Sequence, residues 1–158
     1  MNYVDTCAVK VVGLKKSYGT TEAVKGINLE IPTGTVFALL GPNGAGKTTT
    51  IEILEGHRKR NAGIVSVLGY DPDTNARSFK QRIGIVLQET GVEPYLTVEE
   101  TIKLFAGYYD QPRSVYDILE ATGLIGLRQV RAQKLSGGQR RRLDVAIGLV
   151  GNPDLLFL

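Results

Sequence analysis

Apolar and polar positions alternate along the first part of the chain. The alternation is clear in Val9-Lys10-Val11 and again between Val24 and Ile31. A period of two is typical of strands that bury one face and expose the other, which antiparallel sheets allow. The pattern therefore predicts an antiparallel β-subdomain over residues 8–34.

A different pattern begins after this subdomain. Five apolar residues, Val36–Leu40, form a run of the length expected for a buried parallel strand. A glycine-rich stretch follows. From Thr48 to Gly56, apolar positions are then spaced by three and four, as on one face of a helix. The sequence predicts a strand, a loop and a helix in direct succession.

The rest of the chain mixes helices with strands. A strand is expected near Ile64–Leu68, a short helix near residues 75–81 and a strand over Ile83–Gln88. Residues 97–134 have helical patterns, and Thr97 with Glu100 three positions later predicts a capping box. The apolar residues Leu155–Leu158 predict a last strand. The expected fold class is α/β.

A phosphate-binding motif lies between the predicted strand and helix. The pattern G-x-x-x-x-G-K-[ST] and one further threonine are formed by Gly41, Pro42, Asn43, Gly44, Ala45, Gly46, Lys47, Thr48 and Thr49. In this pattern backbone N–H groups bind phosphate oxygens, Lys47 reaches the β- and γ-phosphates, and the Thr48 hydroxyl binds Mg²⁺. A glycine-rich turn without a ligand is the alternative. The match at every fixed position, with a strand and a helix on either side, favours the phosphate site.

A second helix N-terminus suited to an anion is predicted further along. The segment consists of Leu135, Ser136, Gly137, Gly138 and Gln139 and is followed by three arginines. Ser136 is a plausible N-cap, and the two glycines leave the backbone accessible. The basic residues in the first turn oppose the helix dipole, so they need a reason other than helix stability.

Composition and charge fit a protein outside the membrane. The 158 residues carry a net charge of +3, with clusters at Arg58–Arg60 and Arg140–Arg142. Nucleic acid is one interpretation of such clusters. Because each is short and has few aromatic neighbours, a solvated face is favoured and no nucleic acid is expected. A lone cysteine, Cys7, and the lack of a secretory signal or an apolar run of about 18 residues predict a cytoplasmic location.

Together, the segment Leu135–Gln139 and the Gly41–Thr48 loop resemble the ABC ATPases. The resemblance extends over Ala8–Leu158 and implies a P-loop NTPase core with an inserted helical subdomain. Residues 1–158 would then be a partial ABC ATPase domain. Its expected segments are an antiparallel β-subdomain at 8–34, a P-loop core at 35–88, a Q-loop and helical subdomain at 89–134, and the signature helix with the start of the Walker B strand at 135–158.

The resemblance also assigns roles to residues outside the two motifs. Tyr18 is similar to the aromatic residue that stacks on adenine. Gln88 is similar to the Q-loop glutamine, which contacts Mg²⁺ and the attacking water. By the same resemblance, Lys47, Gln88 and Ser136 are the expected catalytic residues, and ATP and Mg²⁺ the expected ligands.

One departure from the family is expected to matter. The family's Mg²⁺-binding aspartate, catalytic glutamate and switch histidine would follow Leu158, and His57, the only histidine, lies in a polar turn instead. We therefore expect an incomplete central sheet, whose open strand edges favour pairing with another copy. We also expect weak nucleotide binding and negligible turnover by these residues alone.

The implied mechanism requires partners. In the family, two ATPase domains associate head to tail, so that Ser136 and its glycines would contact the γ-phosphate bound by the partner's loop. The segment after Gln88 would face a transmembrane permease subunit, placing the protein at the inner face of the cell membrane. Three parts of the chain look most like subunits of bacterial drug and polysaccharide exporters: Arg77–Gln88, Leu96–Glu100 and Asp144 after the arginines.

Two other classes of ABC-type ATPase were considered. Chromosome-organising and repair proteins separate the loop from the signature by a long coiled coil, and sustained heptads are absent here. Soluble tandem-domain proteins that act on ribosomes remain an alternative, although one loop and one signature give no support to it.

Overall fold

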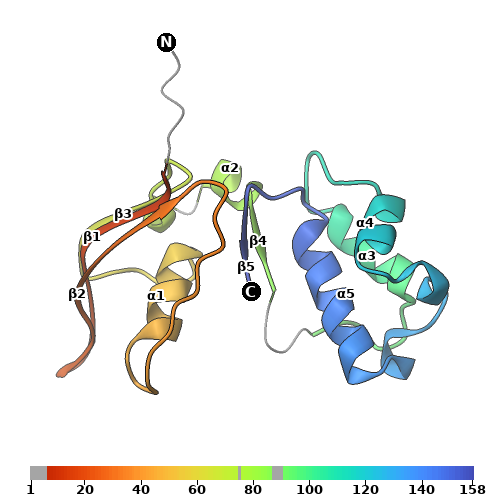
Figure 1. The fold of residues 1–158 in the computed structure, drawn as a ribbon, viewed down its shortest axis with the longest axis horizontal. Helices are drawn as coiled ribbons and strands as arrows, with labels where there is room; N and C mark the ends of the chain where they lie inside the picture. Colours follow the sequence, from red (N-terminus) through yellow and green to blue (C-terminus); the bar gives the residue numbers. More distant parts are fainter. Residues whose placement is uncertain (1–6, 75, 87–90) are drawn as a thin grey trace, which may run out of the picture. The chain divides into compact units, whose positions relative to one another are not determined.

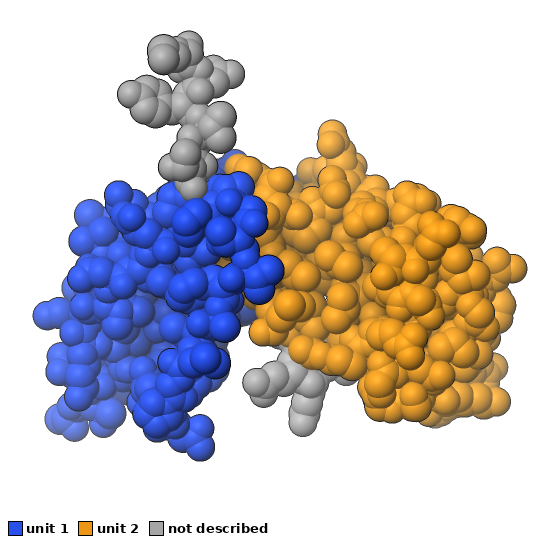
Figure 2. Space-filling view, viewed as in Figure 1, with its two compact units in different colours: residues 1–79 blue, residues 80–158 orange. Residues whose placement is uncertain are grey.

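The computed structural model describes residues 7–74, 76–86 and 91–158. It divides into two compact units, unit 1 (Met1–Phe79) and unit 2 (Lys80–Leu158), which Figure 2 shows in different colours. The sequence analysis divides the chain into segments at 8–34, 35–88, 89–134 and 135–158. These boundaries stay predictions.

Unit 1 contains a three-stranded antiparallel sheet (Figure 1). Its strands are β1 (Cys7–Tyr18), β2 (Thr21–Pro32) and β3 (Ala62–Val67), in the order β2-β1-β3. Val9 is opposite Ile31 of β2 and Val67 of β3, and all three side chains are buried. The alternating pattern thus produced the antiparallel subdomain that it predicts.

The helix of the glycine-rich region packs beneath this sheet. Helix α1 (Lys47–Leu54) buries Ile53 and Leu54, and a 3-10 turn, η1 (Pro72–Thr74), and the short helix α2 (Arg77–Lys80) follow β3. Phe79 of α2 is fully buried and its ring lies 6.1 Å from that of Tyr70. The helices expected at Thr48–Gly56 and near residues 75–81 are confirmed within one or two residues.

The buried strand predicted for Val36–Leu40 is wrong. Residues 35–42 form neither helix nor strand, and Val36 and Leu40 have exposed fractions of 103% and 87%. A parallel strand needs neighbours for its backbone N–H and C=O groups and cover for both faces. Among the described residues no strand pairs with this segment, so its apolar composition alone does not make it a strand.

Unit 2 contains a parallel strand pair. Strand β4 (Ile83–Ile85) pairs with β5 (Leu155–Phe157), with Ile83 opposite Leu155 and Ile85 opposite Phe157. The last strand expected from the sequence is therefore ordered within the chain. Its pairing with a second copy stays a prediction. The end of the strand predicted at Gln88 lies outside the described residues.

Helices make up the remainder of unit 2. They are α3 (Val98–Ala106), α4 (Val115–Ala121) and α5 (Gly137–Leu149), with 3-10 turns η2 (Ile125–Leu127) and η3 (Ala132–Lys134) between the last two. Thr97 caps α3 and forms the predicted capping box with Glu100. Within the described residues, no helix has the length and apolar content needed to cross a membrane.

One apolar core holds these helices together. Its fully buried members come from all three helices and the segments between them, and include Val98, Ile102, Ile118, Leu124, Leu143, Ala146 and Val150. Strand β4 lies directly against α5. A Cβ built on Gly84 would be only 2.1 Å from the carbonyl oxygen of Gly148, so the contact leaves no room for a side chain. The core therefore fixes where α5 begins, which is the position of the second motif.

This packing predicts a contrast between two substitutions in α3. Ile102 is fully buried, whereas Leu104 has an exposed fraction of 50%. Ile102→Ala should destabilise unit 2 by about 2–5 kcal/mol, and the control Leu104→Ala by less than about 0.5 kcal/mol. Hydrogen exchange over residues 98–150 measures both. Equal protection loss in the two variants would contradict this core.

Candidate functional site

The phosphate-binding motif forms a turn that leads into α1 in unit 1. The N–H of Ala45 donates to the carbonyl of Pro42 at 3.2 Å, and Gly46 occupies the N-cap of the helix with a left-handed φ of 82°. Glycine has no side chain with which to cap the helix. The N–H groups of the first turn of α1 are therefore suited to an anion, which the helix dipole also attracts.

Lys47 folds back over this turn. Its Nζ donates to the carbonyl oxygens of Gly41 and Pro42, both at 2.7 Å. An ammonium group has three donors, so these two bonds leave one for another acceptor. Phosphate oxygens would have to compete with the two carbonyls for this cation.

Gly46 also sets the distance between the loop and the sheet. A Cβ at this position would lie 2.3 Å from the carbonyl oxygen of Ala23 and 3.2 Å from a methyl group of Val24, both in β2. Gly44 has the same φ of 82°, yet a Cβ there would meet nothing within 4 Å. Backbone conformation favours glycine at both positions, whereas packing requires it only at Gly46.

The remaining groups of the loop are accessible. Asn43, Ala45 and Thr48 are exposed, and Thr49 is half-buried. The hydroxyl oxygen of Thr48 is the hard type of ligand that Mg²⁺ prefers, and it lies in the first turn next to Lys47. These residues therefore fit a phosphate group with its metal ion. The other expected metal ligand, Gln88, lies outside the described residues.

Tyr18 lies at the end of β1, in the same unit as the loop. The ring is partly exposed, and Lys16 Nζ and Arg58 Cζ each lie 5.3 Å from its centre. The sequence analysis did not identify these two cations. No pattern in a single sequence pairs Tyr18 with Arg58, which is 40 positions away.

The cluster Arg58–Arg60 is not the solvated face that the sequence analysis favoured. The Nε of Arg58 donates to Glu52 at 2.5 Å, and Arg60 forms ion pairs with Asp71 and Asp73 at 2.6 and 2.8 Å. The side chain of Arg60 has an exposed fraction of 15%. Hydrogen bonding to Arg60 lowers the pKa of Asp71. These arginines therefore hold the turn after α1 in place, and of the cluster only Lys59 is exposed.

The second motif begins helix α5 in unit 2. Ser136 is the N-cap, and its Oγ accepts from the Gln139 N–H at 3.3 Å while Gln139 Oε1 accepts from the Ser136 N–H at 2.9 Å. This capping box uses oxygen lone pairs, so the Ser136 hydroxyl hydrogen and the Gln139 amide hydrogens can still donate. A Cβ on Gly137 or Gly138 would meet nothing within 4 Å, so this helix end faces open space.

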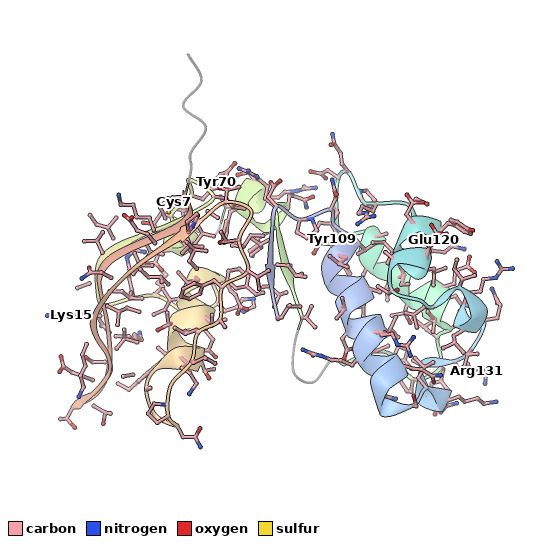
Figure 3. All side chains as sticks on the ribbon, viewed as in Figure 1. Cys7, Lys15, Tyr70, Tyr109, Glu120 and Arg131 are labelled. Carbon is pink, nitrogen blue, oxygen red and sulfur yellow. The ribbon has the colours of Figure 1, made fainter. Side chains whose placement is uncertain are left out.

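The three arginines after this motif are exposed, as expected of a solvated face, and two of them also contact nearby backbone. Arg140 Nη2 donates to the carbonyl of Ala132 at 3.2 Å, and Arg142 Nη1 lies 3.5 Å from the carbonyl of Gly123. They connect α5 to the segments between α4 and α5. At the other end of α5, Gly151 lies against the ring of Tyr109, which Figure 3 labels, and burial raises the pKa of this tyrosine.

The structure thus groups the expected site residues in two sets. The loop and Tyr18 belong to unit 1, and the residues Ser136–Gln139 belong to unit 2. Each set contains the N-terminus of a helix, preceded by Gly46 in the first set and by Ser136 in the second. The set in unit 1 contains both a cationic side chain, Lys47, and an aromatic ring, Tyr18.

Comparison with known proteins identifies the family. A model of the ABC transporter family matches residues 24–158, which include both motifs. The chain belongs to the ABC transporter family. It is 36% identical over 158 residues to a Nod factor export ATP-binding protein I of Ralstonia nicotianae, covering 97% of this chain and 49% of that protein. The chain spans about half the length of the curated relatives that it matches.

Solved structures show the same fold. The chain aligns with cbiO1 from Clostridium perfringens, part of the ABC transporter complex cbiONQ, at 28% identity and a TM-score of 0.83, over 96% of this chain and 64% of that one. It aligns with a dimeric structure of a bacterial ABC transporter cassette at 27% identity and a TM-score of 0.75, over 94% and 72%. The ABC ATPase fold with its antiparallel amino-terminal sheet, expected from the sequence, is confirmed.

The two glycines of the loop give a direct test of its packing. Gly44→Ala should carry only the penalty of a left-handed alanine, about 1–2 kcal/mol. Gly46→Ala should carry the same penalty and in addition push the loop away from the Ala23 carbonyl. We expect its denaturant midpoint to fall well below that of Gly44→Ala, with hydrogen-exchange protection lost in β2. Equal destabilisation by the two variants would show that the contact with β2 is unimportant.

Glu55, which ends α1, predicts a pH dependence. Burial raises its pKa above the ordinary 4.5, although the nearby His57 opposes the shift. Folded protein then binds a proton that the unfolded chain has lost, so this group's contribution to stability falls as pH rises from 4.5 through the folded-state pKa. Glu55→Gln should therefore gain stability over the wild type at about pH 7 but not at about pH 4. Urea midpoints at both values test this, with the exposed Glu30→Gln as control, which should show no such difference.

Proposed function

We propose that this chain binds the phosphates of ATP, with Mg²⁺, at the Gly41–Thr48 loop. The observation that carries the proposal is the N-terminus of α1, which begins after a left-handed glycine and places Lys47 over the loop. Backbone N–H groups, a cation and the helix dipole converge there. They favour a polyanion over a neutral ligand.

Individual residues take the roles that the family suggests. Lys47 binds the β- and γ-phosphates, Thr48 and Gln88 hold the metal ion, and Tyr18 stacks on the adenine ring. When bound, Mg²⁺ neutralises part of the phosphate charge. Lys47 can offer phosphate the donor that its bonds to the carbonyls of Gly41 and Pro42 leave over, and any further bond to phosphate competes with these carbonyls.

Hydrolysis in the whole protein requires a second set of donors at the γ-phosphate. Phosphoryl transfer to water depends mainly on positioning and on neutralising charge. Ser136, Gly137 and Gly138 can donate a hydroxyl and two amide hydrogens from a helix end that faces open space. We propose that they act on the nucleotide bound to a second copy, with Lys47, Gln88 and Ser136 as the catalytic residues of the composite site.

A head-to-tail homodimer provides this arrangement. Two-fold symmetry makes each chain contribute one loop and one signature, so two equivalent nucleotide sites form. The dimeric state of a bacterial ABC transporter cassette with 27% identity supports the proposal. The residues of the two sets lie in different units, which also suits a site completed by another chain.

We further propose that the whole protein drives export. Three curated relatives that match more than nine-tenths of this chain are each named Nod factor export ATP-binding protein I. A transmembrane permease subunit would recognise the cargo and hold the ATPase at the inner face of the cell membrane. Closure of the dimer on ATP would then be transmitted to the permease.

Nucleotide binding can be tested by thermal unfolding. ATP with Mg²⁺ at about 100 times its Kd should stabilise the chain by about 2.7 kcal/mol. Lys47→Ala should abolish the shift because the loop then loses its cation. Lys59→Ala, which removes the same charge from an exposed position after α1, should keep it.

Phosphate release measured on the same samples should remain near background. General-base help is typically worth about 10²–10⁴ in rate, and the carboxylates that supply it in the family were not found in these 158 residues. An unfolding temperature unchanged by ATP, or an equal shift in Lys47→Ala, would contradict the proposed site. Sustained hydrolysis that disappears in Lys47→Ala would contradict only the expected lack of turnover.

A further inference from the structure

The contact between Arg58 and Tyr18 joins two parts of unit 1 that are distant in sequence. Tyr18 ends β1, whereas Arg58 lies in the turn after α1. The guanidinium carbon is 5.3 Å from the centre of the ring, within the distance of a cation–π interaction. Arginine presents a planar group that stacks well on an aromatic face.

Arg58 is itself fixed to the helix of the phosphate loop. Its Nε donates to the Glu52 carboxylate at 2.5 Å, and its backbone N–H donates to the Glu52 carbonyl at 3.1 Å. Hydrogen bonding to Glu52 also raises the pKa of Arg58. Because Glu52 belongs to α1, one rigid helix carries the loop at its first residue and the anchor of Arg58 near its last turn.

The turn that carries Arg58 is also bound to the end of β1. Asn61 donates its N–H to the carbonyl of Lys15 at 2.9 Å, and its Oδ1 accepts from the N–H of Ser17 at 2.8 Å. These two bonds hold the backbone on the amino-terminal side of Tyr18. The ring contact with Arg58 then restricts the side chain itself.

Lys16 offers an internal comparison. Its Nζ is also 5.3 Å from the ring centre. Lys16 lies on the same strand as Tyr18 and its side chain is a flexible stem, so it cannot set the position of the ring relative to α1. The two cations therefore differ in what they connect, although their distances to the ring are equal.

We propose that Arg58 is a positioning residue that holds Tyr18, through Glu52, at a fixed place relative to the phosphate loop. The inference rests on the proposed binding of ATP by the loop and Tyr18. One nucleotide would bind Tyr18 with its base and the start of α1 with its phosphates, so the ring must be at the right distance from α1. A ring held before binding also loses less side-chain freedom on binding.

The test compares ATP with inorganic triphosphate, which has phosphates but no base. Binding of both, each with Mg²⁺, is measured by calorimetry on the wild type and on Arg58→Ala, Lys16→Ala and Lys59→Ala. Arg58→Ala should weaken ATP about threefold to fivefold relative to triphosphate. Lys16→Ala and Lys59→Ala should leave the ratio of the two affinities unchanged, because they remove a charge without releasing the ring from α1.

Three further variants test the connection to α1 and the dependence of the effect on Tyr18. Glu52→Gln should weaken ATP relative to triphosphate, but by less than Arg58→Ala does. A neutral amide still holds the guanidinium, although less strongly than a carboxylate. In Tyr18→Ala, which should weaken ATP about tenfold, adding Arg58→Ala should cause no further change in the ratio. A purely structural effect of Arg58 would instead weaken ATP and triphosphate equally.

The outcomes separate this inference from the proposed function. Equal loss of both ligands in Arg58→Ala, no loss of either, or an effect of Lys16→Ala on the ratio as large as that of Arg58→Ala would overturn the role of Arg58. Failure of the proposed function is different. In that case the wild type binds neither ligand, or Lys47→Ala binds both as well as the wild type does.

Discussion

The close approach of Gly46 to β2 is the constraint on which the proposed nucleotide site depends. No Cβ fits between this residue and the carbonyl of Ala23, and the same residue occupies the N-cap position of α1. A larger residue would move the helix start and, with it, the N–H groups and Lys47. The antiparallel sheet of unit 1 is therefore the surface that positions the phosphate end of the site.

Helix α1 also connects the loop to Tyr18. In the proposed site, helix α1 presents its first turn to the phosphates and, through Glu52 and Arg58, reaches the ring of Tyr18 near its other end. In unit 2 an apolar core places the start of α5, where the capping box orders Ser136 and Gln139 but leaves their hydrogens able to donate. Each motif is thus a helix N-terminus held by its own core, which suits a reaction assembled from two chains.

Local signals in the sequence predicted local structure well. The alternation in β1 and β2, the start of α1, the capping box of Thr97 and the N-cap at Ser136 depend on neighbours within a few residues, and all were predicted. The strand prediction for Val36–Leu40 was wrong because a parallel strand depends on partners that composition does not reveal. The contacts of Arg58 with Glu52 and Tyr18 were missed for the same reason, since a run of basic residues does not indicate which of them will be paired.

The most direct test of the account is the amide response of the loop to phosphate. Proton–nitrogen NMR spectra of the chain, recorded while inorganic triphosphate and Mg²⁺ are added, report on each backbone N–H separately. The account predicts large shifts at Gly44, Gly46, Lys47 and Thr48, and none of these in Lys47→Ala. Shifts confined to residues outside the Gly41–Thr48 loop, or equal shifts in Lys47→Ala, would show that the loop at α1 is not the phosphate site.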